Sequence, residues 1–226
     1  MATVKLNERT LSILKNFQEI NSAIVFKPGK EIDTISPTKK VLATATIEQE
    51  FDSTFGIYEL NKFFGAISLF KNPELTIEKT FIDIHEGHRS LRYVIADPLD
   101  IRPPTENQFN KLPSVDVEFK LTEKTIKNAI KAAGVLNHKE IVLIGDGEKV
   151  VISTQNVDKP TPESYSEDVG EFTGDKPFKM IMKVENLHLF PGEYAVRLCF
   201  KMKIVQFEGK DVNYFVAAEA NSTVSK

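Results

Sequence analysis

The chain has 226 residues, of which 41% are hydrophobic and 27% are charged, and its net charge is −3. This length accommodates one large domain or two domains of about 110 residues, and the composition is that of a globular protein rather than a disordered or fibrous one. The acidic excess excludes a protein that coats DNA with its whole surface, although it leaves room for a local basic patch.

The sequence also limits the compartment in which the protein is expected. It contains no run of about 20 apolar residues that would span a membrane. The first residues, 1–6, turn polar at once and lack the apolar core of a signal peptide. Cys199 is the only cysteine, so an internal disulfide is excluded, which fits a reducing compartment.

The first predicted element is a helix that begins after Asn7, a good N-cap residue, with Glu8 in its positive first turn. Its helical period separates two sides. The apolar side carries Leu6, Ile13, Leu14, Phe17 and Ile20. The polar side carries Arg9, Ser12, Lys15, Asn16 and Glu19.

Extended segments and one further helix follow in the first half of the chain. A hairpin is predicted over 23–35, with its turn at 27–30, because two apolar runs flank a Pro-Gly pair. The helical period returns over 59–70. The remaining strands are expected at 41–47, 54–58, 75–79, 81–85 and 91–96.

Residues 97–113 differ from their surroundings because they contain four prolines among polar residues and have weak helix and strand signals. We interpret this segment as an interdomain linker. It divides the chain into a predicted N-terminal domain, 1–108, and a predicted C-terminal domain, 109–226.

A third helix, predicted over about 122–133, repeats the design of the first. Thr122 is the expected N-cap, Leu121 and Ile126 form a hydrophobic staple, and Gly134 is expected to stop the helix. Lysines three and four positions apart share one side of this helix. They are Lys124, Lys127 and Lys131.

The second half then repeats the order of the first: strands, a short helix and three closing strands. The short helix is predicted over 184–190. The strands are expected at 141–144, 150–153, 169–173, 178–183, 193–200, 203–207 and 212–218. This order predicts the α+β class, with two tandem similar domains whose helices lie on one face of antiparallel sheets.

The sequence offers no credible catalytic centre, and no metal or cofactor is expected. His85 and His88 are three residues apart around a glycine, which is typical of a turn rather than a zinc helix. Residues 145–148 lack the Lys-Ser/Thr continuation of a phosphate loop and predict a hairpin turn. Cys199 lies in an apolar strand, which favours a buried structural thiol, and Asp97 and Asp100 lack a third ligand.

The lysine faces have two interpretations. A run of lysines on one side of a helix is commonly an ordinary solvated surface. Its recurrence in both halves of an acidic chain favours contact with phosphates. Without interleaved aromatic residues, such contacts would be weak, salt-sensitive and independent of base sequence.

Several short segments resemble a known family, the sliding clamps of T-even-type bacteriophages, which are the processivity factors of their DNA polymerases. The resemblance follows the order and spacing of motifs along the chain. They are Leu14-Lys15-Asn16-Phe17, Ile20-Asn21-Ser22, Ile57-Tyr58-Glu59-Leu60-Asn61, Phe64-Gly65 with Leu69, Pro191-Gly192-Glu193-Tyr194, Phe207-Glu208-Gly209, Asn213-Tyr214 and Ala217 with Glu219-Ala220-Asn221-Ser222-Thr223.

The resemblance implies a clamp fold and a head-to-tail homotrimer that closes into a ring around double-stranded DNA, with helices lining the hole. The basic residues would then face the duplex. Those on the two repeated helices are Arg9, Lys15, Lys124, Lys127 and Lys131; Lys5, Lys62 and Lys120 complete the predicted set.

The resemblance also implies partners. Clamps of this family recruit DNA polymerase and late-transcription proteins through short C-terminal peptides, and an ATP-dependent clamp loader opens the ring. The peptides enter an apolar pocket beside the domain linker, which corresponds in this chain to Ile101, Phe109, Pro191, Tyr214 and Val216. These five residues equally suit simple packing of the domain junction. The host would be an infected bacterium, with the protein in its cytoplasm.

Two other functions remain open from the residues alone. An oligomeric viral structural protein would explain the sheet content, but it would not explain the repeated lysine faces. An enzyme acting on DNA ends or nucleotides would need clustered carboxylates or a phosphate loop, and the sequence contains neither motif.

Overall fold

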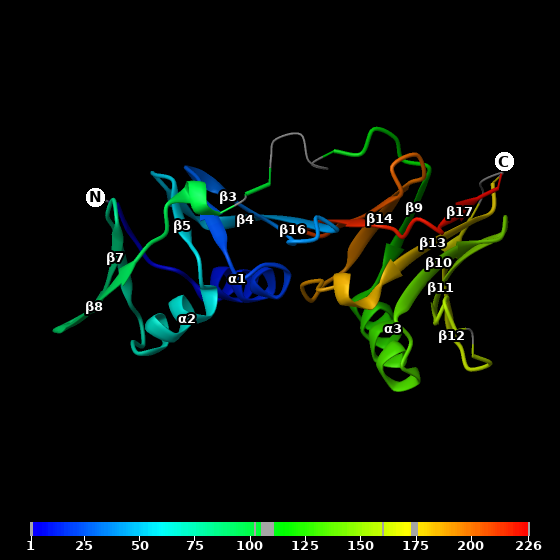
Figure 1. The fold of residues 1–226 in the computed structure, drawn as a ribbon, viewed down its shortest axis with the longest axis horizontal. Helices are drawn as coiled ribbons and strands as arrows, with labels where there is room; N and C mark the ends of the chain where they lie inside the picture. The colour runs from blue at the N-terminus through cyan, green and yellow to red at the C-terminus, as the bar shows by residue number, and fades with distance from the viewer. Residues whose placement is uncertain (1, 102, 105–110, 160, 173–175, 226) are drawn as a thin grey trace. The chain divides into compact units, whose positions relative to one another are not determined.

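The computed structural model describes residues 2–101, 103–104, 111–159, 161–172 and 176–225. The chain forms two compact units, Met1–Gln108 and Phe109–Lys226. Each unit combines antiparallel β-strands with helices packed against them (Figure 1).

In the N-terminal unit, the strands form two antiparallel layers with the orders β5-β2-β3-β4 and β1-β6-β7-β8. Their bounds are β1 Ala2–Val4, β2 Ile24–Phe26, β3 Gly29–Ile35, β4 Val41–Phe51, β5 Phe55–Ile57, β6 Glu74–Ile77, β7 Phe81–Glu86 and β8 Arg89–Val94. The helices are α1 (Glu8–Ile20) and α2 (Leu60–Ser68), and a 3₁₀ turn, η1, spans Pro98–Asp100. Helix α1 packs on β3 and β4, and α2 contacts both α1 and β8 (Figure 1).

In the C-terminal unit, the two layers have the orders β9-β14-β15-β16 and β12-β11-β10-β13-β17. The bounds are β9 Val117–Leu121, β10 Glu140–Gly145, β11 Lys149–Gln155, β12 Tyr165–Glu171, β13 Phe178–Lys183, β14 Tyr194–Cys199, β15 Ile204–Glu208, β16 Val212–Ala217 and β17 Thr223–Val224. Helix α3 (Glu123–Leu136) packs on β10, β11 and β12, and a 3₁₀ turn, η2, spans Val184–Asn186.

The two units share one topology. The order β1-β6-β7-β8 corresponds to β9-β14-β15-β16, and β5-β2-β3-β4 corresponds to β13-β10-β11-β12. Each unit places its first helix directly after its first strand. The predicted pair of similar tandem domains, with helices on antiparallel sheets, is therefore confirmed.

Equivalent threonines attach the first helix of each unit to its sheet. Thr10 is 1% exposed, and its hydroxyl donates to Gln49 Oε1 on β4 at 2.6 Å. Thr125 is 7% exposed, and its hydroxyl donates to Glu167 Oε1 on β12 at 2.9 Å. Because buried hydroxyls need partners, these bonds fix which side of each helix faces its sheet.

The two predicted N-caps are also present. The Asn7 side chain accepts a hydrogen bond from the Thr10 amide at 2.8 Å, and the Thr122 hydroxyl accepts one from the Thr125 amide at 3.1 Å. In both helices, the side-chain oxygen of the cap residue accepts a hydrogen bond from a backbone N–H group that would otherwise lack a partner within the helix.

The predicted stop at Gly134 is wrong. Helix α3 continues to Leu136, and its C-cap is Asn137, which adopts a left-handed conformation with φ 54°. Asparagine tolerates this conformation better than most residues because its short polar side chain bonds locally. Gly134 therefore lies inside the helix.

The predicted helix over 184–190 is also wrong beyond its first turn, since only η2 is helical. The backbone of Phe190 bonds to tyrosine side chains instead: its N–H donates to Tyr214 Oη at 3.0 Å, and its carbonyl accepts from the Tyr194 hydroxyl. These bonds occupy backbone groups that a continuing helix would need.

Most other elements agree with the sequence, within shifts at their ends. The hairpin over 23–35, the helix over 59–70 and the turn at 145–148 are confirmed by β2 with β3, by α2 and by β10 with β11. The strand expected at 169–173 is β12, which begins earlier, at Tyr165. The sequence missed the short strands β1 and β17, and it missed β9.

The position of Gly134 generates a stability prediction. We expect Gly134→Ala to raise the free energy of unfolding by about 0.8 kcal/mol, because alanine loses less backbone entropy than glycine inside a helix. A methyl group at this position would meet no atom within 4 Å. Urea denaturation monitored by circular dichroism would measure the difference.

The neighbouring cap supplies the control. Asn137→Ala should lower stability by about 1 kcal/mol, because alanine pays for the left-handed conformation. If Gly134→Ala instead destabilised the protein, the helix would not continue through this residue in solution.

Candidate nucleic-acid interface

Helix α3 presents a basic side because its other side is buried. Thr125, Ile126, Ala129 and Ala133 face the sheet. On its other side, the side chains of Lys124, Lys127 and Lys131 are all exposed. Lys127 forms an ion pair with Glu123 one turn earlier, which holds its amine along the helix surface.

Helix α1 has the same arrangement. Ile13, Leu14 and Phe17 are almost fully buried, with exposed fractions of 1% or less. Arg9 and Lys15 lie on the exposed side, and the Lys15 amine lies 6.0 Å from the centre of the Phe64 ring on α2, a cation–π contact.

The remaining residues of the predicted basic set come from other elements. Lys5 lies between β1 and α1, Lys62 lies in the first turn of α2, and Lys120 lies on β9. All three side chains are exposed. Acidic residues share these surfaces, since Glu8 and Glu19 are also exposed on α1, so the positive potential is concentrated on α3.

Two edge strands carry opposite charges. Among the described strands, β8 is the last of its layer in the N-terminal unit, and it exposes Arg89 and Arg92. Arg92 donates two hydrogen bonds to Asp83 on β7, at 2.9 and 3.0 Å, and these bonds lower the pKa of Asp83 and raise that of Arg92. Both groups therefore stay charged over the physiological pH range.

The edge strand β12 of the C-terminal unit is acidic. It carries Glu167, Asp168 and Glu171. Asp168 accepts a hydrogen bond from Lys149 on β11 at 2.8 Å, and this bond raises the pKa of that lysine. Sequence analysis missed both edges because which strand ends a sheet depends on long-range pairing.

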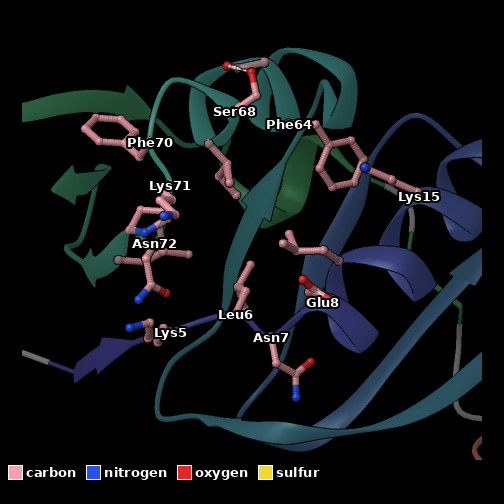
Figure 2. Close-up of a pocket in the computed structure, with 15 residues that line it drawn as sticks. Lys5, Leu6, Asn7, Glu8, Lys15, Phe64, Ser68, Phe70, Lys71 and Asn72 are labelled. Carbon is pink, nitrogen blue, oxygen red and sulfur yellow. Dashed lines mark hydrogen bonds between the residues drawn. The ribbon is translucent and has the colours of Figure 1, made fainter. Parts of the chain in front are cut away.

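The N-terminal unit also contains an open groove of about 820 Å³ between the start of α1 and the end of α2 (Figure 2). Three lysines line it: Lys5, Lys15 and Lys71. Lys71 was not predicted as a functional residue. Its contribution depends on the end of α2 lying beside the segment before α1, which no local pattern indicates.

The predicted peptide-pocket residues lie in different environments. Tyr214 and Val216 are buried in the C-terminal unit, with exposed fractions of 1% and 0%, and Ile101 is buried in the N-terminal unit at 5%. Pro191 is exposed. Phe109 lies outside the described residues. The pocket itself stays a prediction.

The side chains weighed for chemistry occupy structural positions. The His85 Nε2 atom lies 3.5 Å from the Glu74 Oε2 atom, and residues 87–88 form the predicted turn between β7 and β8. Cys199 is buried, as predicted. Within the described ranges, no cluster of three metal-ligating side chains occurs, and no helix there has the length and apolarity needed to cross a membrane.

Comparison with known proteins identifies relatives that match nearly the whole chain. The family described as the C-terminal domain of the gp45 sliding clamp matches residues 118–220. The sliding clamp of Enterobacteria phage T4 is 30% identical over 97% of this chain and 99% of its own. The sliding clamp of Vibrio phage KVP40 is 28% identical over 96% of this chain and 100% of its own.

Solved structures with similar folds are also clamps. The chain matches Archaeoglobus fulgidus PCNA, solved with the C-terminal region of FEN-1, with a TM-score of 0.74 at 18% identity over 99% of this chain and 100% of that one. The Helicobacter pylori β clamp matches with a TM-score of 0.68 at 11% identity, over 96% of this chain and 65% of that longer one. At these identities, the likeness establishes the DNA-clamp fold.

Sliding clamps act as processivity factors and are not enzymes, so these relatives agree with the lack of a catalytic motif in the sequence. They give no support to a viral structural protein. Full-length similarity at 30% identity, together with the shared fold, shows that the chain belongs to the sliding clamp family of T4-type bacteriophages.

Proposed function

We propose that this protein encircles double-stranded DNA as a homotrimeric ring and tethers the replicative DNA polymerase of its phage, in the cytoplasm of the infected bacterium. One observation carries the proposal: the equivalent helices α1 and α3 both bury an apolar side on a sheet and expose basic side chains. The two units would be the N-terminal and C-terminal clamp domains.

The basic residues suit a sliding contact. Lysine amines on flexible stems reach phosphates without reading bases, so the duplex can move past them. Such contacts are individually weak and are weakened further by salt. A closed ring compensates for weak contacts, because the duplex cannot leave sideways. The DNA-facing set would be Lys5, Arg9, Lys15, Lys62, Lys120, Lys124, Lys127 and Lys131.

Ring closure requires a head-to-tail contact between different surfaces of neighbouring copies. The edge strands β8 and β12 support such a contact, because they belong to different units and carry opposite charges. Pairing β8 of one copy with β12 of the next would satisfy backbone groups on both edges, which are otherwise open to unwanted association. Repetition of this contact around a threefold axis would close the ring.

The proposed partners are those of the family: double-stranded DNA, the DNA polymerase, an ATP-dependent clamp loader and late-transcription proteins. The C-terminal peptides of the polymerase and of the late-transcription proteins would enter the pocket predicted at Ile101, Phe109, Pro191, Tyr214 and Val216. Exposed Pro191 would contact a peptide directly. Tyr214 would support this contact indirectly, because its hydroxyl accepts a hydrogen bond from the backbone N–H of Phe190, the residue before Pro191.

The DNA contact can be tested with the triple variant Lys124→Glu, Lys127→Glu, Lys131→Glu. We expect processive synthesis on singly primed circular DNA, with polymerase and loader present, to fall about tenfold or more, since three phosphate contacts become repulsive. The salt dependence of synthesis should also weaken by about one unit of slope for each lysine removed.

A matched control changes the same charge elsewhere. Lys79→Glu, Lys176→Glu, Lys210→Glu replaces three exposed lysines outside the helices, and synthesis should be retained. Sedimentation should show both variants at the oligomeric state of the unmodified protein. Unchanged synthesis by the α3 variant would contradict the assignment of its lysines.

The proposed subunit contact can be tested by exchanging the charges of Asp83 on β7 and Arg92 on β8. The double variant Asp83→Arg, Arg92→Asp keeps an ion pair between β7 and β8 but puts a carboxylate on the edge strand in place of a guanidinium. We expect oligomer dissociation, measured by analytical ultracentrifugation, to rise about fivefold because like charges would face each other. Adding Asp168→Lys on β12 should restore assembly. Equal assembly of all three proteins would exclude this pair of edges.

The peptide pocket can be tested with a fluorescent peptide that copies the C-terminus of the phage's own DNA polymerase. We expect Pro191→Ala to weaken its binding, measured by fluorescence anisotropy, by about fivefold, because an exposed apolar contact is lost. Pro28→Ala, which changes an exposed proline of the N-terminal unit, should bind as the unmodified protein does. Equal binding by both variants would remove Pro191 from the pocket.

A further inference from the structure

The groove of the N-terminal unit is an opened version of a site that the C-terminal unit keeps closed. Leu6, Leu11 and Lys15 line the groove. Their equivalents in the sequence repeat, Leu121, Ile126 and Ile130, line a residual cavity of only about 10 Å³ against α3. That cavity has room for about one water molecule at most.

In the C-terminal unit, apolar side chains fill the space beside α3 that corresponds to the groove. Leu187 and Leu189, which follow η2, fill the space beside α3 together with Met182 and Phe207. In the N-terminal unit, the equivalent segment is the longer helix α2, and it leaves about 820 Å³ unfilled. The position that Ile130 occupies in α3 is occupied by Lys15 in α1. An open, charged groove is therefore a specific feature of this unit and is not imposed by the fold.

The floor of the groove is apolar and accessible. Leu6, Leu11, Phe64, Phe70 and Pro73 all line it and are only partly buried. Ile67 and Leu75 close the bottom, with exposed fractions of 8% and 3%. Partly exposed apolar and aromatic side chains gathered in one concave site are typical of surfaces that bind a partner.

The rim of the groove is positively charged. Lys5 and Lys71 lie on the same side of it, and Lys15 lies at the far end beside Phe64 (Figure 2). Neither Lys5 nor Lys71 forms an ion pair with another described residue. Glu8 is the acidic residue among the lining side chains. The rim therefore favours an anionic partner, and the floor favours an apolar one.

The aromatic rings do not suit stacking with nucleic-acid bases. The Arg89 guanidinium lies 5.5 Å from the centre of the Phe70 ring, and the Lys15 amine lies 6.0 Å from that of Phe64. Each ring thus already has a cation over one of its faces, which leaves less of the ring for stacking with a base. A phosphate backbone would also leave the apolar floor uncovered.

We propose that this groove is a second partner-docking site, which binds an acidic peptide segment of another protein that inserts a leucine or phenylalanine side chain between α1 and α2. Carboxylates flanking the anchor would pair with Lys71 and would compete with DNA for Lys5 and Lys15, which also belong to the proposed DNA-facing set. The anchor would cover Phe64, Phe70 and Leu11. This site is lined by residues of the N-terminal unit alone, and it shares no residue with the predicted pocket at Pro191 and Tyr214.

The proposal can be tested on the full chain with a fluorescein-labelled probe peptide, Glu-Asp-Glu-Leu-Phe-Asp-Asp-Glu, by anisotropy. Ser68→Trp places a bulky ring at the exposed end of α2, in the groove lining, and should weaken binding about tenfold by occupying the anchor site. Lys71→Glu should weaken binding about fivefold through charge reversal at the rim.

Matched controls separate this site from general charge attraction. Lys79→Glu alters an exposed lysine between β6 and β7 of the same unit that does not line the groove, and it should leave binding unchanged. A probe with serines in place of Leu-Phe should bind about tenfold more weakly than the original. Thermal unfolding of each variant would verify that the fold is intact.

Three outcomes would overturn the proposal. The first is equal binding of the original and the serine probe. The second is an equal loss of binding in Lys79→Glu and Lys71→Glu. The third is displacement of the probe by a short DNA duplex whose own binding depends on Ser68 and Lys71, which would make nucleic acid the occupant. None of these outcomes bears on processive synthesis by the α3 variant, so the docking site and the clamp function can fail separately.

Discussion

The burial of one side of the first helix in each unit is the constraint from which the surface properties follow. Helix α1 packs on its sheet through the buried side chains of Phe17, Leu14 and Ile13. Full burial of such a side chain contributes about 1.5–3 kcal/mol to the stability of the folded state. The hydroxyls of Thr10 and Thr125 then fix the rotation of α1 and α3 by bonding to β4 and β12. Once the buried side is fixed, the helical period decides that Arg9, Lys15 and the three α3 lysines face outward.

This constraint explains why much of the fold and of the basic surface could be predicted from the sequence. The N-caps Asn7 and Thr122, the amphipathic periods and the hairpin turns depend on residues close together in the chain. Gly134 shows the limit of local reasoning, because glycine also occurs inside helices and the left-handed cap is Asn137, three positions later. The segment before Pro191 shows another limit, since its backbone is bonded by Tyr194 and Tyr214 from other strands.

What could not be predicted depends on which elements become neighbours. The acidic edge of β12 and the basic edge of β8 are sheet edges only because no further described strand of the same unit pairs with them by backbone hydrogen bonds. The groove likewise needs Lys71, after α2, to lie beside Lys5, before α1 (Figure 2). Sequence periodicity identifies the exposed side of one helix, but it carries no information about the distance between two helix ends.

The duplicated fold allows one unit to be interpreted through the other. Strand order is the same in both, so positions that differ between them were not required by the architecture. The buried threonines and apolar sides are kept in α1 and α3, which indicates that both helices need the same attachment to their sheets. The space beside the helix is filled by Leu187 and Leu189 in one unit but left open, with Lys15 at its end, in the other. Leaving partly exposed leucine and phenylalanine side chains in water forgoes the stabilisation that the second unit obtains by closing the site. A partner that covers this surface would recover that stabilisation, and the positive rim would select for partners with acidic residues beside their apolar anchor.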